Sequence, residues 1–495
     1  MKNRLVQGTI ILTIAGILTR IIGFGYRILL AGSLGETKLG VYQLIFPVYS
    51  ICFTLYAAGI QTSVSQLISH EPDREHRAIM KSGMLLSLFV SCLLSILLFF
   101  FAAPVGKSFL GTEETIPLLR ILAVIFPFCG ITSIINGYFY GISDAKTPAI
   151  SQIIEQLFRV GFVCIAGFLV LQGRLSKELA VMGLVAGELA ANILNISRLS
   201  THMNLLDIIK KPCRHYVGRL LSLSVPLSGN KLVISLLGSM ESVLIPAMLM
   251  RYGCKEADAL AIFGILTGIV MPFIMFPGTI TNSLSVLLLP AISRAAGEKN
   301  HDSIRQTTEI TLHYSLLLGV FTTGIFLVYG KNLGLYLFQS ENAGKLLTLL
   351  SVICPFLYCS TTLTSVINGL GKTGITFFNT VIGLGVRIVC LVFFVPVYGI
   401  YGYLTGFVLS QILICLLNGI YIGHKTKQQY HLLRDFVWPL IFSISVLVLI
   451  KKFIDSFFAF LPPLIGSGAG LCTSALIILL YLYKTKQISW KDFRY

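Results

Sequence analysis

Residues 141–159, GISDAKTPAISQIIEQLFR, align without a gap on residues 369–387, GLGKTGITFFNTVIGLGVR. The alignment places Arg159 opposite Arg387, and each arginine lies inside an apolar segment. A shared pattern of glycine, isoleucine and arginine at one spacing indicates that two parts of the chain have the same local structure. This internal match is the observation from which the predicted architecture follows.

A second match lies just beyond the first, because residues 183–187 and 402–406 both have the form Gly-x-x-x-Gly. Both matches fall on the fifth and sixth apolar segments of successive six-segment blocks. Six is even, so both blocks start on the same side of the membrane and form a parallel repeat. Two such lobes that enclose a cavity at the middle of the membrane are typical of a transporter that opens this cavity alternately to the two sides. The expected domains are an N-lobe at 1–202, a cytoplasmic linker at 203–216, a C-lobe at 217–424, and two further helices with a cytoplasmic tail at 425–495.

The composition places the chain among membrane proteins. Hydrophobic residues make up 55% of its 495 residues, charged residues make up 12%, and the mean hydropathy is +0.83. Apolar runs of about twenty residues are long enough to cross a bilayer as helices. We therefore predict an all-α polytopic membrane protein with about fourteen spans, near 5–32, 40–67, 83–104, 116–141, 147–171, 178–201, 217–250, 257–291, 306–329, 343–369, 374–395, 400–423, 436–454 and 463–483.

The first span resembles a secretory signal because Lys2 and Arg4 precede an apolar run. The run continues past Arg20 and Arg27 without an A-x-A cleavage site, so it is predicted to be a retained helix. Basic residues also predict the orientation. The terminal and even-numbered connections carry 22 of the 38 Lys and Arg residues, which places both termini in the cytoplasm.

The net charge of +17 is spread over short loops. This distribution favours anionic membrane lipids as partners and gives no reason to expect nucleic acid.

Charged residues inside the apolar spans are the candidate functional residues. A charge at the centre of a membrane helix costs roughly 2.5–3.5 kcal/mol on an insertion scale, so such residues usually mark a substrate or ion pathway. The chain has five cations and three acids of this kind: Arg20, Arg27, Arg159, Lys231, Arg387, Glu155, Glu188 and Glu241. The cations are assigned to the substrate cavity and the acids to coupling or gating.

The two arginines of the first helix are seven residues apart, which is nearly two helical turns and places them on one face. Arg20 is expected to be intramembrane, whereas Arg27 either faces the cavity or extends to the outer interface. In the fifth helix, Glu155 and Arg159 have the i,i+4 spacing of an ion pair. This pair is either a structural clamp or part of a gating or proton-coupled step.

Arg387 has Gly383 where its repeat mate has an acid, so it needs an anionic partner, which could be Glu188, Glu241 or the substrate. Pro226 and Gly229 predict a break before Lys231 and Glu241 in the seventh helix, which makes this helix a candidate moving element.

Other classes of site lack their sequence signatures. The glycine pair at 183–187 is typical of helix packing, and no P-loop, disulfide framework or metal-ligand spacing is present. The chain is therefore predicted to be a transporter and not an enzyme, without a metal ion or other cofactor, and to act as a monomer.

Five strings carry a resemblance to a known family. They are LTRIIGFGYR at 18–27, LGVYQ at 39–43, SQIIEQLFR at 151–159, AGELA at 186–190 and LLLPAIS at 287–293. In order and spacing they resemble the stage V sporulation protein B branch of the multidrug/oligosaccharidyl-lipid/polysaccharide (MOP) exporter superfamily, which is related to lipid II flippases.

The resemblance implies a MATE-like fold with two lobes in a V, an electropositive cavity and export of lipid-linked sugars. Two first-helix arginines of the flippases correspond to Arg20 and approximately to Arg27, with one more residue between them here. Transfer of the flippases' sodium site is not supported, because no matching aspartate stands in the seventh, eleventh or twelfth helix.

The sequence therefore predicts a flippase for an undecaprenyl-diphosphate-linked peptidoglycan precursor used in spore cortex synthesis. Guanidinium groups bind phosphate oxygens in pairs and stay charged, which suits a diphosphate. Peptidoglycan synthesis enzymes are candidate partners.

Three alternatives remain. The first is a cation-coupled multidrug exporter of the same fold, which would need a cavity dominated by acids. The second is a membrane-embedded glycosyltransferase or polymerase, which would need a catalytic acid pair. The third is a scaffold protein that has lost the ability to transport. For the enzyme, only Glu113 and Glu114 are adjacent in an outer connection, where solvation explains them better.

Overall fold

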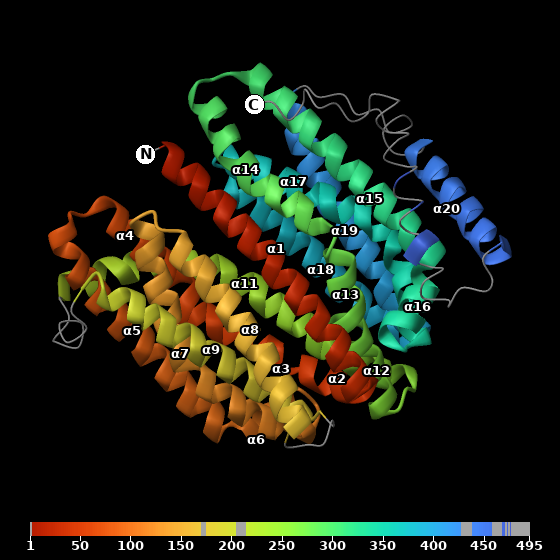
Figure 1. Cartoon of the computed structure of the whole chain (residues 1–495), viewed down its shortest axis with the longest axis horizontal. Coiled ribbons are helices and arrows are strands. Elements are labelled where there is room, and N and C mark those ends of the chain that lie inside the picture. Colours follow the sequence, from red (N-terminus) through yellow and green to blue (C-terminus); the bar gives the residue numbers. More distant parts are fainter. Residues whose placement is uncertain are drawn as a thin grey trace. The chain divides into compact units, whose positions relative to one another are not determined.

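The computed structural model describes residues 2–169, 175–203, 214–426 and 438–457, together with 468–470, 473 and 476. All regular elements in these residues are helices (Figure 1). They form twelve stretches long and apolar enough to cross a membrane, which correspond to the first twelve predicted spans except that the eighth ends at Met275 instead of 291. The all-α membrane class is therefore confirmed. The thirteenth predicted span corresponds to α20 (Trp438–Phe457), and the fourteenth lies largely outside the described residues.

Contacts within the chain divide it into two compact units, Met1–Gly268 and Ile269–Tyr495. The first unit contains α1 (Lys2–Leu34), α2 (Glu36–Gln43), α3 (Ile45–Phe53), η1 (Thr54–Ala58), α4 (Gly59–His70), α5 (Asp73–Phe100), α6 (Ala102–Pro104), η2 (Val105–Phe109), η3 (Glu113–Thr115), α7 (Ile116–Gly141), α8 (Lys146–Leu169), α9 (Lys177–Ser200), α11 (Arg214–Tyr252), α12 (Glu256–Gly264) and most of η4 (Ile265–Val270). The helix pairs α8 with α9 and α5 with α7 pack closely in this unit.

The second unit contains the end of η4 and the later helices. These are α13 (Met271–Met275), α14 (Gly278–Gly297), α15 (His301–Phe338), α16 (Glu341–Leu350), η5 (Ser351–Ile353), α17 (Cys354–Gly369), α18 (Thr373–Tyr398), α19 (Ile400–Thr426) and α20. Here α18 packs against α19, as α8 packs against α9 in the first unit. Helices α11 and α12 pack with the first unit. The six-plus-six repeat at 1–202 and 217–424 stays a prediction.

Proline has different effects in different spans. The eighth span, predicted as one helix at 257–291, is divided near Pro272 and Pro277 into α12, η4, α13 and α14. By contrast, α11 is continuous through Pro226, so the predicted break at this proline and Gly229 is wrong. A proline removes one backbone hydrogen bond, and a long membrane helix can tolerate this loss when its neighbouring turns stay intact.

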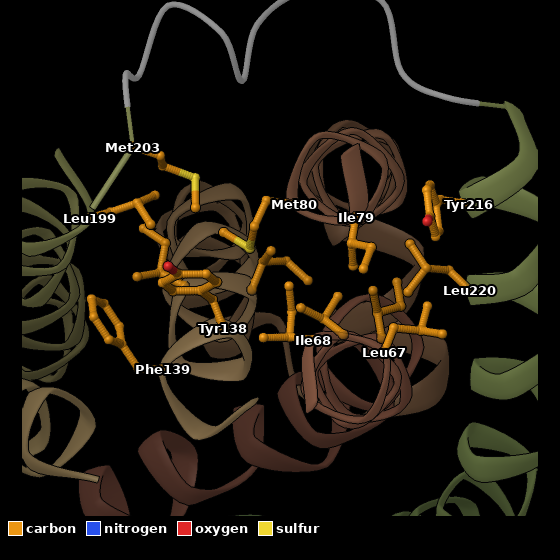
Figure 2. Packing of buried hydrophobic residues seen from close by; sticks show 14 residues of the cluster. Leu67, Ile68, Ile79, Met80, Tyr138, Phe139, Leu199, Met203, Tyr216 and Leu220 are labelled. Atoms are coloured by element: carbon orange, nitrogen blue, oxygen red, sulfur yellow. The ribbon is translucent and has the colours of Figure 1, made fainter. Parts of the chain in front are cut away.

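Buried apolar side chains form a core cluster in the first unit (Figure 2). Side chains from α4, α5, α7 and α11 meet there, among them Ile68, Ile79, Phe139 and Leu220, each at most 2% exposed. The outer surfaces are also apolar, as Phe100 (74% exposed) and Ile193 (71%) illustrate. A buried apolar core together with exposed apolar faces is the pattern expected of helices surrounded by lipid.

Candidate functional site

An ion pair on α8 lies at the centre of the candidate site. Arg159 Nη2 donates to Glu155 Oε1, and Arg159 Nη1 donates to Gln156 Oε1 at 3.3 Å. The side chains of Arg159 and Glu155 are 21% and 26% exposed. The i,i+4 pair predicted from the sequence is therefore confirmed. Arg159 Nε is buried and has no hydrogen-bond partner among the described residues, so one donor of this guanidinium remains available.

Two glycines of α9 explain how the pair is partly shielded. A Cβ atom on Gly183 would lie 3.2 Å from the carbonyl oxygen of Arg159, and one on Gly187 would lie 3.1 Å from Cβ of Arg159. Because neither glycine has a side chain, α8 and α9 approach each other closely at the level of the pair. The prediction that the Gly183-x-x-x-Gly187 face is a packing surface is confirmed.

Glu188 extends the site onto α9. Its side chain is buried, and it interacts electrostatically with Glu155 and Arg159. Asn192 Nδ2 lies 3.5 Å from Glu188 Oε1 and also donates to Thr132 Oγ1 at 2.9 Å. The group formed by Glu155, Arg159, Glu188, Asn192 and Thr132 is called the polar cluster below. It brings together helices α7, α8 and α9 inside an otherwise apolar bundle.

Arg27 approaches the polar cluster from α1. Its side chain is half-buried, and its Nη1 donates to the carbonyl oxygen of Gly268 at 3.5 Å. Helix α1 packs against α8 here, since a Cβ atom on Gly23, one helical turn before Arg27, would lie 3.2 Å from Nε2 of Gln156 on α8. Arginines that are 132 positions apart in the sequence therefore lie on two helices that pack together within one unit.

The remaining predicted residues of the first unit lie elsewhere. Arg20 is exposed on α1. Lys231 is exposed on α11, and its Nζ donates to the carbonyl oxygen of Ala58 at 3.4 Å. Glu241 is buried farther along the same helix. The structure thus brings four of the eight predicted residues together, namely Arg27, Glu155, Arg159 and Glu188.

Arg387 belongs to the second unit. Its guanidinium lies 4.0 Å above the ring of Phe407, and its Nε and Nη2 lie 3.4 Å and 3.3 Å from Ser410 Oγ. Both partners are on α19. Arg387 therefore uses an aromatic face and a hydroxyl group where Arg159 uses a carboxylate, which agrees with Gly383 standing in place of the acid.

Sequence reasoning missed Thr132 and Asn192, because polar but uncharged residues are common in membrane helices. A signal was available on α9, where Glu188, Asn192 and Asn195 are spaced by four and three residues and so share one face. Asn195 is fully buried, and neither its Oδ1 nor its Nδ2 has a partner among the described residues. Buried amides inside membrane helices seek polar partners, and this stripe could have located the face that meets α7.

Two relatives of known sequence resemble the chain over most of its length. It is 29% identical to stage V sporulation protein B of Bacillus subtilis (strain 168) over 433 residues, which is 84% of this chain and 83% of the relative. It is 23% identical to the lipid II flippase MurJ of the same organism over 464 residues, which is 88% of this chain and 85% of the relative. The resemblance that the five strings indicated is confirmed.

Solved structures share the fold. One is a lipid II flippase MurJ in an inward closed conformation, with a TM-score of 0.73, 15% identity, and coverage of 96% of this chain and 100% of that one. Another is an inward-facing multidrug resistance MATE family transporter of the MOP superfamily, with a TM-score of 0.65, 16% identity, and coverage of 83% and 96%. These likenesses confirm the MATE-like fold.

Models of two protein families match the chain. The MatE model matches residues 232–393, and the model of polysaccharide biosynthesis proteins matches residues 5–296. The second match covers more than half of the chain and includes most of α1 and the whole polar cluster. The chain therefore belongs to the polysaccharide biosynthesis protein family.

Proposed function

We propose that the protein moves a lipid-linked polysaccharide precursor from the cytoplasmic to the outer leaflet of the cell membrane. The proposed substrate is an undecaprenyl-diphosphate-linked peptidoglycan precursor for the spore cortex. Similarity to stage V sporulation protein B and to a lipid II flippase supports the substrate class. The relatives are transport proteins or sporulation proteins by name, which supports transport over glycosyl transfer.

The observation that carries the proposal is that Arg27 and Arg159 lie on α1 and α8, two helices that pack together in the membrane-spanning part of the first unit. Two cations that repel each other in a medium of low dielectric are stabilised when an anion binds between them. Guanidinium groups match phosphate oxygens in geometry and stay charged at every physiological pH. A diphosphate has enough oxygens to contact both groups at once.

Glu155 gives the site a way to couple substrate binding to an ion. In the substrate-free protein, the carboxylate of Glu155 neutralises Arg159. When the diphosphate binds Arg159 in place of Glu155, the carboxylate of Glu155 loses its counter-charge, while the carboxylate of Glu188 remains close to it. Two neighbouring carboxylates without a cation favour uptake of a proton or a metal cation, so substrate exchange and ion uptake become linked.

The other predicted residues have supporting roles in this proposal. Arg20, Lys231 and Arg387 contribute positive charge to the cavity that the headgroup crosses, and Glu241 contributes to gating on α11. Both termini lie in the cytoplasm, as the distribution of basic residues predicts. The protein works as a monomer beside peptidoglycan synthesis enzymes.

A flipping assay with the full-length protein in liposomes tests the function. The substrates are an undecaprenyl-diphosphate-linked disaccharide, undecaprenyl phosphate and a cationic dye. We expect transport of the first and a loss of at least about tenfold in Arg27→Gln and Arg159→Gln, because each replacement removes a charge-assisted contact to the diphosphate. Arg251→Gln, which changes an exposed arginine at the end of α11, is the control. Transport of the dye alone would establish a drug exporter instead.

A further inference from the structure

A groove on the surface of the first unit shares no residue with the polar cluster. It is about 430 Å³ in volume and is formed by α5, α7, α8 and α9. Its lining is apolar except for Arg120 on α7. Pockets that hold small ligands have volumes of about 300–1,000 Å³ and similar apolar walls, so the groove is large enough for part of a lipid chain.

The groove arises from the sizes of neighbouring side chains. Ala186 on α9 forms part of its floor, whereas Phe162, Met182 and Leu189 stand around it and are 38%, 44% and 38% exposed. Val124 on α7 is 48% exposed. These apolar residues are open to the lipid that surrounds a membrane-spanning unit, and a membrane lipid is the ligand available at this depth.

Arg120 gives one end of the groove a charge. It lies four residues after the start of α7, which is about 6 Å along the helix axis. Its guanidinium lies 6.0 Å from the ring centroid of Phe99, and among the described residues it has no ion pair. Two nearby lysines differ in this respect, because Lys107 pairs with Glu113 and Lys177 pairs with Glu114. Unlike these two lysines, Arg120 has no carboxylate partner among the residues that the structure describes, so it is free to meet an anion from the membrane.

We propose that this groove binds one acyl chain of an anionic phospholipid whose phosphate pairs with Arg120. The acyl chain by itself gains little free energy on moving from the bilayer into the groove, because lipid tails are as apolar as the leucine and valine side chains of a protein. Selectivity must then come from the headgroup, and Arg120 is placed to provide it. The site does not depend on the transport proposal, since it shares no residue with the polar cluster.

Native mass spectrometry of the full-length protein in detergent tests the site. The probes are dioleoylphosphatidylglycerol and dioleoylglycerol, which has the same chains without the phosphate. Arg120→Gln removes the charge, Arg120→Lys keeps it, and Val124→Trp fills the groove. The matched controls are Arg251→Gln, another exposed arginine, and Ile193→Trp, an exposed residue of α9 outside the groove.

We expect Arg120→Gln to weaken retention of one phosphatidylglycerol molecule about fivefold, as one basic residue near a membrane surface contributes about this factor. Arg120→Lys should retain most of the binding, and Val124→Trp should abolish it. Dioleoylglycerol should bind weakly and should not respond to Arg120→Gln. Equal retention of the two lipids, or equal effects of Arg120→Gln and Arg251→Gln, would overturn the proposal. The lysine and glutamine variants decide it even if Val124→Trp fails to fold.

Discussion

Arg159 has two different partners in this interpretation, the carboxylate of Glu155 and the phosphate of a substrate. The sequence predicted the pair from its spacing, because residues four apart lie on the same side of a helix. It did not indicate that Gly183 and Gly187 would let α9 pack closely over the pair or that Glu188 would lie beside it. Those contacts depend on how α9 docks on α8.

Variants of the pair separate a clamp from a coupling site. If Glu155 and Arg159 only neutralise each other, losing one partner leaves an uncompensated charge and is costly, whereas losing both is nearly neutral. We expect Glu155→Gln and Arg159→Gln to lose transport and the double variant not to recover it, because Arg387 keeps an arginine without an adjacent acid. Flipping per molecule in liposomes is the measurement. Recovery in the double variant would show that the pair is a clamp.

Arg387 provides a second test at the same scale. Replacement by alanine should abolish transport without reducing the amount of protein in the membrane, because removing an intramembrane charge eases insertion. Arg387→Lys should recover only part of the activity, since an ammonium group lacks the planar fork of donors with which a guanidinium binds two phosphate oxygens side by side. Membrane abundance and transport are measured on the same preparations. If Arg387→Ala fails to accumulate but transports normally per molecule, the arginine holds α18 against Phe407 and Ser410 instead.

Close helix crossings decide the packing at the scale of the elements. Helices α2 and α12 cross at Gly40 and Gly264. A Cβ atom on Gly264 would lie 2.6 Å from the carbonyl oxygen of Glu36 and 2.7 Å from Cα of Gly40. Both obstacles are backbone atoms, which cannot move aside as a flexible side chain can. This crossing is one reason why α12 belongs to the first unit.

Gly264→Ala should therefore destabilise the first unit by about 1–3 kcal/mol, the usual range for an overpacked site. A thermal unfolding curve of the purified protein gives the measurement. Gly25→Ala on α1 is the control, because nothing lies within 4 Å of the added atom and alanine favours a helix over glycine. Equal unfolding temperatures for the two variants would mean that α2 and α12 do not cross as tightly as the structure places them.

At the scale of the whole molecule, an even number of spans places both termini on one side. We expect that side to be the cytoplasm, because 22 of the 38 basic residues lie in the connections on it. Single cysteines near residues 76 and 254, on a background without other cysteines, should differ in labelling by an impermeant maleimide in intact cells. The position near 254 should be labelled and the position near 76 protected. The opposite pattern would invert the topology and the proposed direction of transport.

The sequence by itself determined that this is a helical membrane protein, and where its first twelve spans lie. The physical reason is local, because a run of about twenty apolar residues has to satisfy its own backbone hydrogen bonds once it is in lipid. The eight charged candidates could likewise be found from the sequence, because a charge inside such a run is costly wherever the run packs.

Only the tertiary structure decided which of these charges meet. Arg27 is half-buried on α1, which packs against the helix of Arg159, whereas Arg20 is exposed on the same helix. It also decided that α11 continues through Pro226 and that Arg120 lies beside an apolar groove. The face that a helix turns toward its neighbour depends on contacts between side chains far apart in the sequence, and spacing along one helix does not contain that information.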